Sequence, residues 1–173
     1  MSVTVAKFLD VADGLQANQF GIGDRYTIRS ISELDPVYKQ LMDRPIPVIM
    51  AVTGGDGRPN LTPMWFDYEG DKVLVNVAEH RKKTEWIRKT PQMTLLLINP
   101  ENMYHWMSLK VTVEREISED DPVEGSRVTE QVNRIWRKYV GNGPEYALRD
   151  PSLDERRVLF ECRVDRIATF GRP

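Results

Sequence analysis

Residues 47–91 read PVIMAVTGGDGRPNLTPMWFDYEGDKVLVNVAEHRKKTEWIRKTP, and this stretch decides the fold. It holds three apolar, strand-like runs, and the glycine-containing segments 54–57 and 69–71 separate them as turns. The runs cover residues 48–53, 60–68 and 72–77. A short helix is predicted over residues 83–89, because the residue before Pro91 avoids the helical region. The stretch therefore predicts three successive strands that lead into a helix.

Three cations, Arg81, Lys82 and Lys83, stand where the third run meets this helix. A helix N-terminus already carries partial positive charge and free backbone N–H groups. Cations there cost roughly 0.3–1 kcal/mol each unless an anion neutralises them. A phosphate or carboxylate would accept hydrogen bonds from side chains and backbone together. The alternative is three solvated cations with Glu79 and Glu85 as partial counter-charges, and the residues alone leave both interpretations open.

Composition limits the class of protein. The chain has 173 residues, of which 40% are hydrophobic and 29% charged, and this indicates one globular domain. The net charge of −2 supplies no global field for nucleic acid or an anionic membrane. The sequence has a single cysteine, Cys162, which excludes an internal disulfide. It has only two histidines, and these three residues are too few for a zinc site of the usual spacing. Without a signal-peptide pattern or a run of transmembrane length, a cytoplasmic protein with no membrane or nucleic-acid partner is expected.

The segments before residue 45 predict a helical or loop lead-in over residues 1–44. A short helix is predicted over residues 3–12 and a loop over residues 16–26. Ser32 is a candidate N-cap for a second helix, with Pro36 in its first turn. Residues 45–173 are expected to form the cofactor-binding barrel, within a single domain overall.

The segments after residue 91 predict more strands than helices. Strands are predicted over residues 93–99, 104–117 and 157–167. The longest helix is expected to begin at 120–122, with Pro122 at its first position, and a short helical stretch to cover 145–149. Mostly antiparallel strands with few helices favour a mainly β fold, a small barrel with flanking helices, over a doubly wound sheet.

Two aromatic segments could contact a planar ligand. Proline cannot donate a ladder hydrogen bond, so Pro63 marks a place where backbone groups are free, and Met64 and Trp65 would flank a ring there. Taken alone, these residues favour an ordinary strand. Residues 104–106 could form a second aromatic lip or a subunit interface. His105 lacks a Ser or Cys partner for a nucleophilic triad, so no catalytic residue is assigned.

Taken together, the segments resemble the split-barrel flavin-binding family that includes pyridoxamine 5′-phosphate oxidase and the flavin/deazaflavin oxidoreductases. The resemblance is carried by DGRPNLTPMWFDYEGD (56–71), LVNV (74–77) and RKKTEWIRKTP (81–91). It covers residues 45–117 well, KYVG (138–141) and the last predicted strand (157–167) more loosely, and the first thirty residues hardly at all.

The resemblance implies a homodimer of split β-barrels with two cofactor sites at the interface. Arg81 and Lys83 match phosphate-binding positions, and Asn76 and Val77 match the strand end beside the isoalloxazine ring. Residues 63–65 match the strand along that ring, and Lys110 falls near a cofactor-contacting glutamine of the oxidases. The predicted cofactor-binding set is therefore Pro63, Met64, Trp65, Asn76, Val77, Arg81, Lys82, Lys83 and Lys110, with no metal ligand.

One departure from the family decides between activities. Vitamin B6 oxidases carry R-x-V-L-L-K on the second strand, whereas residues 62–67 here read TPMWFD and lack both cations. The PMWF form is similar to the subgroup that uses coenzyme F-420, a deazaflavin hydride carrier. We therefore expect an oxidoreductase that transfers a hydride from this deazaflavin to a small unsaturated organic substrate, with solvent or Tyr104 as proton source.

Two alternatives stay open at this point. The first is an FMN-dependent oxidase or reductase of the same fold. The second is a non-catalytic barrel that holds a flavin or haem, for which His105 would be the candidate axial ligand.

Overall fold

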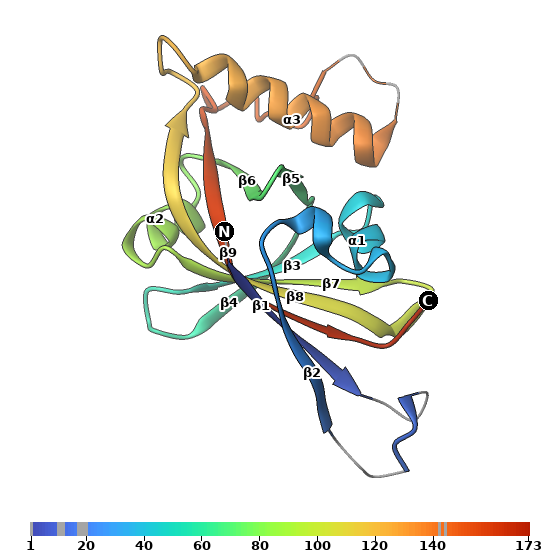
Figure 1. The fold of residues 1–173 in the computed structure, drawn as a ribbon. Coiled ribbons are helices and arrows are strands. Elements are labelled where there is room, and N and C mark those ends of the chain that lie inside the picture. The colour runs from blue at the N-terminus through green and yellow to red at the C-terminus, as the bar shows by residue number, and fades with distance from the viewer. Residues whose placement is uncertain (1, 10–12, 17–20, 142, 144) are drawn as a thin grey trace.

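The computed structural model describes residues 2–9, 13–16, 21–141, 143 and 145–173 of the chain. The described part forms nine strands, three α-helices and a short 3-10 helix, Ile31–Glu33 (Figure 1). The strands are β1 (Val3–Leu9), β2 (Gly21–Ile28), β3 (Val48–Thr53), β4 (Pro59–Met64), β5 (Asp67–Glu69), β6 (Lys72–Ala78), β7 (Gln92–Asn99), β8 (Asn102–Ser118) and β9 (Arg157–Phe170). The helices are α1 (Pro36–Asp43), α2 (Lys82–Lys89) and α3 (Gly125–Val140).

Strand β9 is the branch point of the sheet. Its first half, from Arg157 to Arg163, pairs antiparallel with β6, and its second half, from Arg166 to Phe170, pairs parallel with β1. Strand β8 pairs with β9 along both halves. The strand order is β2-β1-β9-β8-β7-β3-β4, with β6 and β5 attached at β9. Because β6 and β1 pair with different halves of one strand, the sheet splits there.

The two faces of this sheet differ in chemistry. Met50, Leu95, Leu109 and Ile167 stand opposite one another on β3, β7, β8 and β9, and each is at most 1% exposed. Alternate residues of a strand point to opposite faces, so the next row lies on the other side. That outer row consists of Leu61, Ala51, Thr94, Lys110 and Arg166. The inner row belongs to the main core, and the outer row carries an exposed leucine and two cations.

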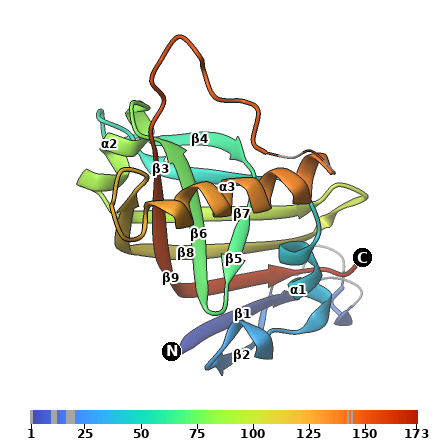
Figure 2. The same ribbon diagram turned by 90° about the horizontal axis from the view of Figure 1, so that it is seen from above.

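Helix α3 covers the part of the sheet that contains β6. It buries Val128 against Leu74, Ile117 and Leu159, which belong to β6, β8 and β9. Seen from above, the helix crosses β6 (Figure 2), and the side chain of Asn76 on that strand donates to the Val128 carbonyl oxygen at 3.0 Å. Among the described helices, none is long and apolar enough to cross a membrane.

The predicted central elements are confirmed, with small differences at their ends. Strand β3 has the predicted bounds, helix α2 begins one residue before the predicted start, and β7, β8 and β9 are longer than predicted. The predicted strand over 60–68 is interrupted: β4 ends at Met64 and β5 begins at Asp67. At this interruption, Tyr139 of α3 contacts the backbone of Phe66.

In the N-terminal segment, the predicted second helix is confirmed as α1, whereas the predictions before residue 27 are corrected. Residues 3–9 form strand β1, because Val3 and Val5 alternate with an exposed Thr4 and enter the main core between β2 and β9. Residues 10–12 of the predicted helix lie outside the described residues. The predicted loop over 16–26 is corrected at its second half, where β2 begins at Gly21 and pairs with β1. Residues 17–20 lie outside the described part.

Three predicted helix features are also corrected. The N-cap of α1 is Asp35, whose carboxylate accepts from the Val37 N–H at 2.9 Å, and Ser32 lies in the 3-10 helix. Helix α3 begins at Gly125 and not at Pro122, because the Asp121 carboxylate holds a turn by accepting from the Val123 and Glu124 N–H groups. Residues 145–149 are not helical.

Candidate cofactor site

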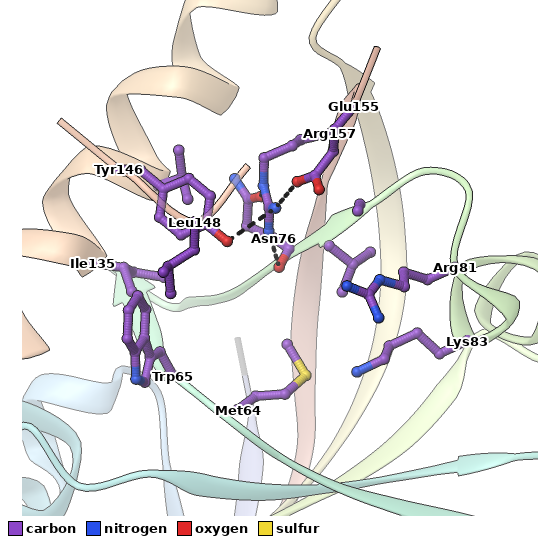
Figure 3. A pocket seen from close by; sticks show the side chains of 13 residues that line it. Met64, Trp65, Asn76, Arg81, Lys83, Ile135, Tyr146, Leu148, Glu155 and Arg157 are labelled. Carbon is purple, nitrogen blue, oxygen red and sulfur yellow. Dashed lines mark hydrogen bonds and ion pairs between the residues drawn. The ribbon is translucent and has the colours of Figure 1, made fainter. Parts of the chain in front are cut away.

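A cavity of about 280 Å³ lies between β6, the start of α2, α3 and the segment before β9. Figure 3 shows its lining in three parts: cations at one end, a polar group in the middle, and aromatic and aliphatic side chains at the other end. Residues far apart in the sequence meet here, from Met64 to Arg157.

Arg81 and Lys83 form the cationic end. The buried hydroxyl of Thr84 donates to the Ala78 carbonyl oxygen at 2.9 Å, which fixes the turn between β6 and α2. The Lys83 amine donates to the Thr62 hydroxyl at 3.2 Å, and within the described part of the chain neither cation forms an ion pair with a carboxylate. Burial lowers the pKa of the Lys83 amine, and the neighbouring Arg81 charge lowers it further. Two adjacent cations that form no ion pair among the described residues therefore leave room for an anion.

Lys82 points away from this cavity. Its side chain is 73% exposed and forms an ion pair of 3.1 Å with Glu85, one turn further along α2. Successive residues of a helix point about 100° apart, so neighbouring cations are directed to different surroundings. The structure thus separates Lys82 from Arg81 and Lys83.

The polar centre is a buried network around Arg157. Its guanidinium donates to the Asn76 side-chain oxygen at 2.6 Å and to the Glu155 carboxylate at 2.7 Å. The side chains of Arg157 and Glu155 are only 9% and 3% exposed. The ring of Tyr146 lies against the guanidinium, at 4.9 Å from its carbon to the ring centroid. This arginine is saturated by protein groups, unlike Arg81.

The aromatic end is organised by Trp65. Its ring stacks on Tyr139 with a centroid separation of 5.4 Å, and Trp136 and Tyr146 contact it at 5.8 and 6.4 Å. Three aromatic neighbours hold the indole in one orientation at the edge of the cavity. The other apolar residues of the lining are Met64, Val77, Ala78, Val132, Ile135 and Leu148.

Tyr139 also explains why the second predicted strand is interrupted. Its hydroxyl accepts from the Phe66 N–H at 2.9 Å and donates to the Ile46 carbonyl oxygen at 2.6 Å. Burial raises the pKa of Tyr139 to about 12, so the hydroxyl keeps the proton it donates. A side chain of α3 therefore satisfies backbone groups of Ile46 and Phe66, and Trp65 between β4 and β5 is turned toward the cavity.

The structure brings together six of the nine predicted cofactor-binding residues. Met64, Trp65, Asn76, Val77, Arg81 and Lys83 line this cavity, and Pro63, Lys82 and Lys110 do not. Pro63 lines a neighbouring cavity of about 400 Å³. Lys110 lies in the outer row of the sheet, beside a hollow of about 510 Å³.

Arg157, Glu155 and Tyr146 were not identified from the sequence. Arg157 stands directly before the apolar run Val158–Phe160 of β9, with Glu155 two residues before it, and this charged pair at a strand start was a weak local signal. Its partner Asn76 is 81 residues away, so the network depends on the pairing of β6 with β9.

The other candidate residues lie outside the site. His105 is fully buried, and its ring nitrogens contact the Asn99 amide at 3.3 Å and the Val37 carbonyl oxygen at 3.0 Å. Both nitrogens are thus engaged, which leaves none for a haem iron. Burial raises the pKa of the Cys162 thiol to about 12, so it is not a nucleophile. Across the described ranges, no group of three or more acidic, histidine or cysteine side chains is placed to hold a metal ion.

Comparison with known proteins agrees with this architecture. The chain is similar in structure to an F420 reductase, with a TM-score of 0.61 and 23% identity over 78% of this chain and 98% of that one. It is also similar to the heme storage protein HutZ from Vibrio cholerae, with a TM-score of 0.56 and 12% identity over 78% and 92% of the two chains. General stress protein 26 from Bacillus anthracis gives a TM-score of 0.52 and 18% identity over 78% and 91%.

These identities show a shared fold. The family model described as pyridoxamine 5′-phosphate oxidase matches residues 34–171, which is most of the chain. The chain therefore belongs to the pyridoxamine 5′-phosphate oxidase family of flavin-binding split barrels.

Proposed function

We propose that this protein is an oxidoreductase that uses the deazaflavin coenzyme F-420 to transfer a hydride to a small unsaturated organic substrate. The observation that carries the proposal is the pair Arg81 and Lys83 in the wall of a cavity, with no carboxylate paired to either among the described residues. A phosphorylated cofactor would supply the missing anion. The F420 reductase fold supports the choice of deazaflavin only as an analogy.

The residues of the cavity fit a phosphorylated, planar cofactor. Arg81 and Lys83 would hold its phosphate, because charge-assisted hydrogen bonds favour anions strongly in a partly buried site. Met64, Trp65 and Val77 would contact its ring system through an apolar surface. The bound cofactor would supply a hydride, and the acceptor would take that hydride and a solvent proton across a C=C or C=O bond.

We further propose that the protein works as a homodimer built on the outer row of the sheet. Leu61 in that row is 64% exposed on β4, which is the last strand of the sheet, and the hollow beside Lys110 lies on the same face. An exposed apolar side chain next to a hollow is suited to contact with a second subunit. Lys110 would then contribute to a cofactor site formed with the partner.

The first test is the visible spectrum of the purified protein, followed by titration with coenzyme F-420 and with FMN. A colourless protein that binds the deazaflavin at micromolar concentration supports the proposal. A yellow protein that retains FMN would overturn the choice of cofactor in favour of an FMN enzyme.

A matched pair of variants tests the phosphate assignment. Lys83→Ala should weaken cofactor binding, and Lys82→Ala should not, because the Lys82 amine is exposed and already paired with Glu85. Equal effects of the two substitutions would show that the cavity cations do not bind the phosphate.

A further inference from the structure

A second cavity, of about 400 Å³, adjoins the candidate cofactor site. The two cavities share four lining residues: Met64, Trp65, Tyr146 and Leu148. A common wall means that a molecule in the second cavity would lie next to a molecule in the first. In Figure 3, Trp65 lies on the side of the site away from Arg81 and Lys83, so the second cavity adjoins the end remote from the cations.

The two cavities differ sharply in charge. The first is lined by Arg81, Lys83, Glu155 and Arg157 among other residues. Apart from the four shared residues, the described lining of the second consists of Pro47 and Pro63, and no charged side chain belongs to it. An ionised ligand there would gain no partner of opposite charge from the described lining, so an uncharged ligand is favoured.

We propose that the second cavity binds the hydride acceptor, and that the acceptor is an uncharged, flat and largely apolar molecule. This inference rests on the proposed function, because it uses the first cavity as the cofactor site. A planar ligand suits the wall, since Trp65 is held edge-on to Tyr146 at an interplanar angle of 86° and stacked on Tyr139 at 15°. Such a fixed indole offers a rigid apolar surface to a ring.

Leu148 is the residue through which this specificity can be tested. It lines both cavities and 60% of its surface is exposed, so part of its side chain is free to contact a ligand. It lies on the segment between α3 and β9, and Tyr146 on the same segment is anchored by its N–H to the Asn133 side chain at 2.9 Å. A ligand in the second cavity would cover the exposed part of Leu148.

The test measures binding of 1,4-naphthoquinone to the full-length protein without cofactor, by equilibrium dialysis read from the absorbance of the quinone. Leu148→Asp should weaken binding by about tenfold or more, because apolar contact is lost and a charge is introduced. Leu153→Asp is the matched control: Leu153 is also exposed, at 46%, lies on the same segment and lines neither cavity. Both sites are at the surface, so neither substitution threatens the core.

The charge of the ligand is tested with the 2-sulfonate of the same quinone. At tenfold higher concentration, the sulfonate should fail to displace bound 1,4-naphthoquinone. Binding of the sulfonate to Arg81 and Lys83 in the first cavity would leave the quinone in the second cavity in place. Displacement by the sulfonate, equal effects of Leu148→Asp and Leu153→Asp, or no binding of the neutral quinone would each overturn the inference.

The same variants separate this inference from the proposed function. Lys83→Ala should weaken the phosphorylated cofactor and leave binding of the neutral quinone unchanged. Loss of the Lys83 effect on the cofactor would reject the cofactor site, whereas a retained Lys83 effect on the cofactor with no Leu148 effect on the quinone would reject the acceptor cavity alone.

Discussion

Two arginines line the same cavity and have opposite surroundings. Arg157 is buried and donates to Asn76 and Glu155, whereas Arg81 stands beside Lys83 and forms no ion pair with a carboxylate among the described residues. A buried charge that is fully paired fixes the position of its neighbours, and a cation that lacks a counter-charge is available to a ligand. The comparison teaches that charge alone does not identify a binding residue; its partners do.

The largest effect on stability should come from removing Arg157 from its ion pair with Glu155. Arg157→Met leaves the Glu155 carboxylate buried without its cation, which should lower the free energy of unfolding by about 3–5 kcal/mol. Urea denaturation measures the change. Arg81→Met should stay within about 0.5 kcal/mol of the wild type, as expected for a residue outside such a network. If the two substitutions cost the same, the distinction between the arginines fails.

A double substitution sharpens the same point. Removing both charges, as Arg157→Met with Glu155→Met, should recover part of the loss, because no uncompensated ion remains buried. A double variant less stable than Arg157→Met would show that Glu155 is held by groups other than Arg157.

Tyr139→Phe extends the comparison to the aromatic end of the site. The substitution removes the partner of the Phe66 N–H and of the Ile46 carbonyl oxygen, so we expect a loss of about 1–3 kcal/mol in the free energy of unfolding. The Trp65 ring should also lose its orientation, measured as a change in near-ultraviolet circular dichroism. Tyr104→Phe is the control, since Tyr104 is 68% exposed. An unchanged spectrum in Tyr139→Phe would contradict this role.

Cofactor binding by the unpaired cation Lys83 should depend on pH. Burial and the Arg81 charge lower the pKa of Lys83, and a protonated amine is needed to bind phosphate. Cofactor affinity should therefore fall as pH rises through that lowered pKa, by about tenfold or more for one charged hydrogen bond. Lys83→Arg should retain affinity to higher pH, because a guanidinium stays charged. Parallel pH profiles for the two proteins would exclude Lys83 as the titrating group.

The smallest effect concerns a buried group far from the cavity. Burial lowers the pKa of His105, so the unfolded chain takes up the proton more readily than the folded one. The stability that His105 contributes is fully present above its unfolded pKa of about 6.5 and decreases as pH falls below it. His105→Gln should reduce the slope of unfolding free energy between about pH 7 and pH 5. Urea denaturation at a series of pH values measures this slope, and an unchanged slope in His105→Gln would contradict the role of His105.

The fold could be predicted where short-range pattern governs it. The run 48–53 became β3 with the expected bounds, because turn-forming glycines follow it directly. The prediction of a helix over residues 3–12 is wrong because β1 is held by pairing with β9, which joins residues about 160 positions apart, and the alternation over residues 3–5 is too short to show this from the sequence. The start of α3 was placed too early because a turn held by Asp121 resembles a first helical turn in sequence.

The candidate site divides in the same way. Local chain order is enough to place cations at a helix start after an apolar strand, because Arg81 and Lys83 are close along the chain and need no distant partner. Packing of distant elements turns Lys82 to solvent, neutralises Arg157 with Glu155 and binds it to Asn76, and encloses Trp65 between Tyr139 and Tyr146. The physical reason is that the availability of a charge or a ring depends on burial and partners, and strand register and helix packing set these.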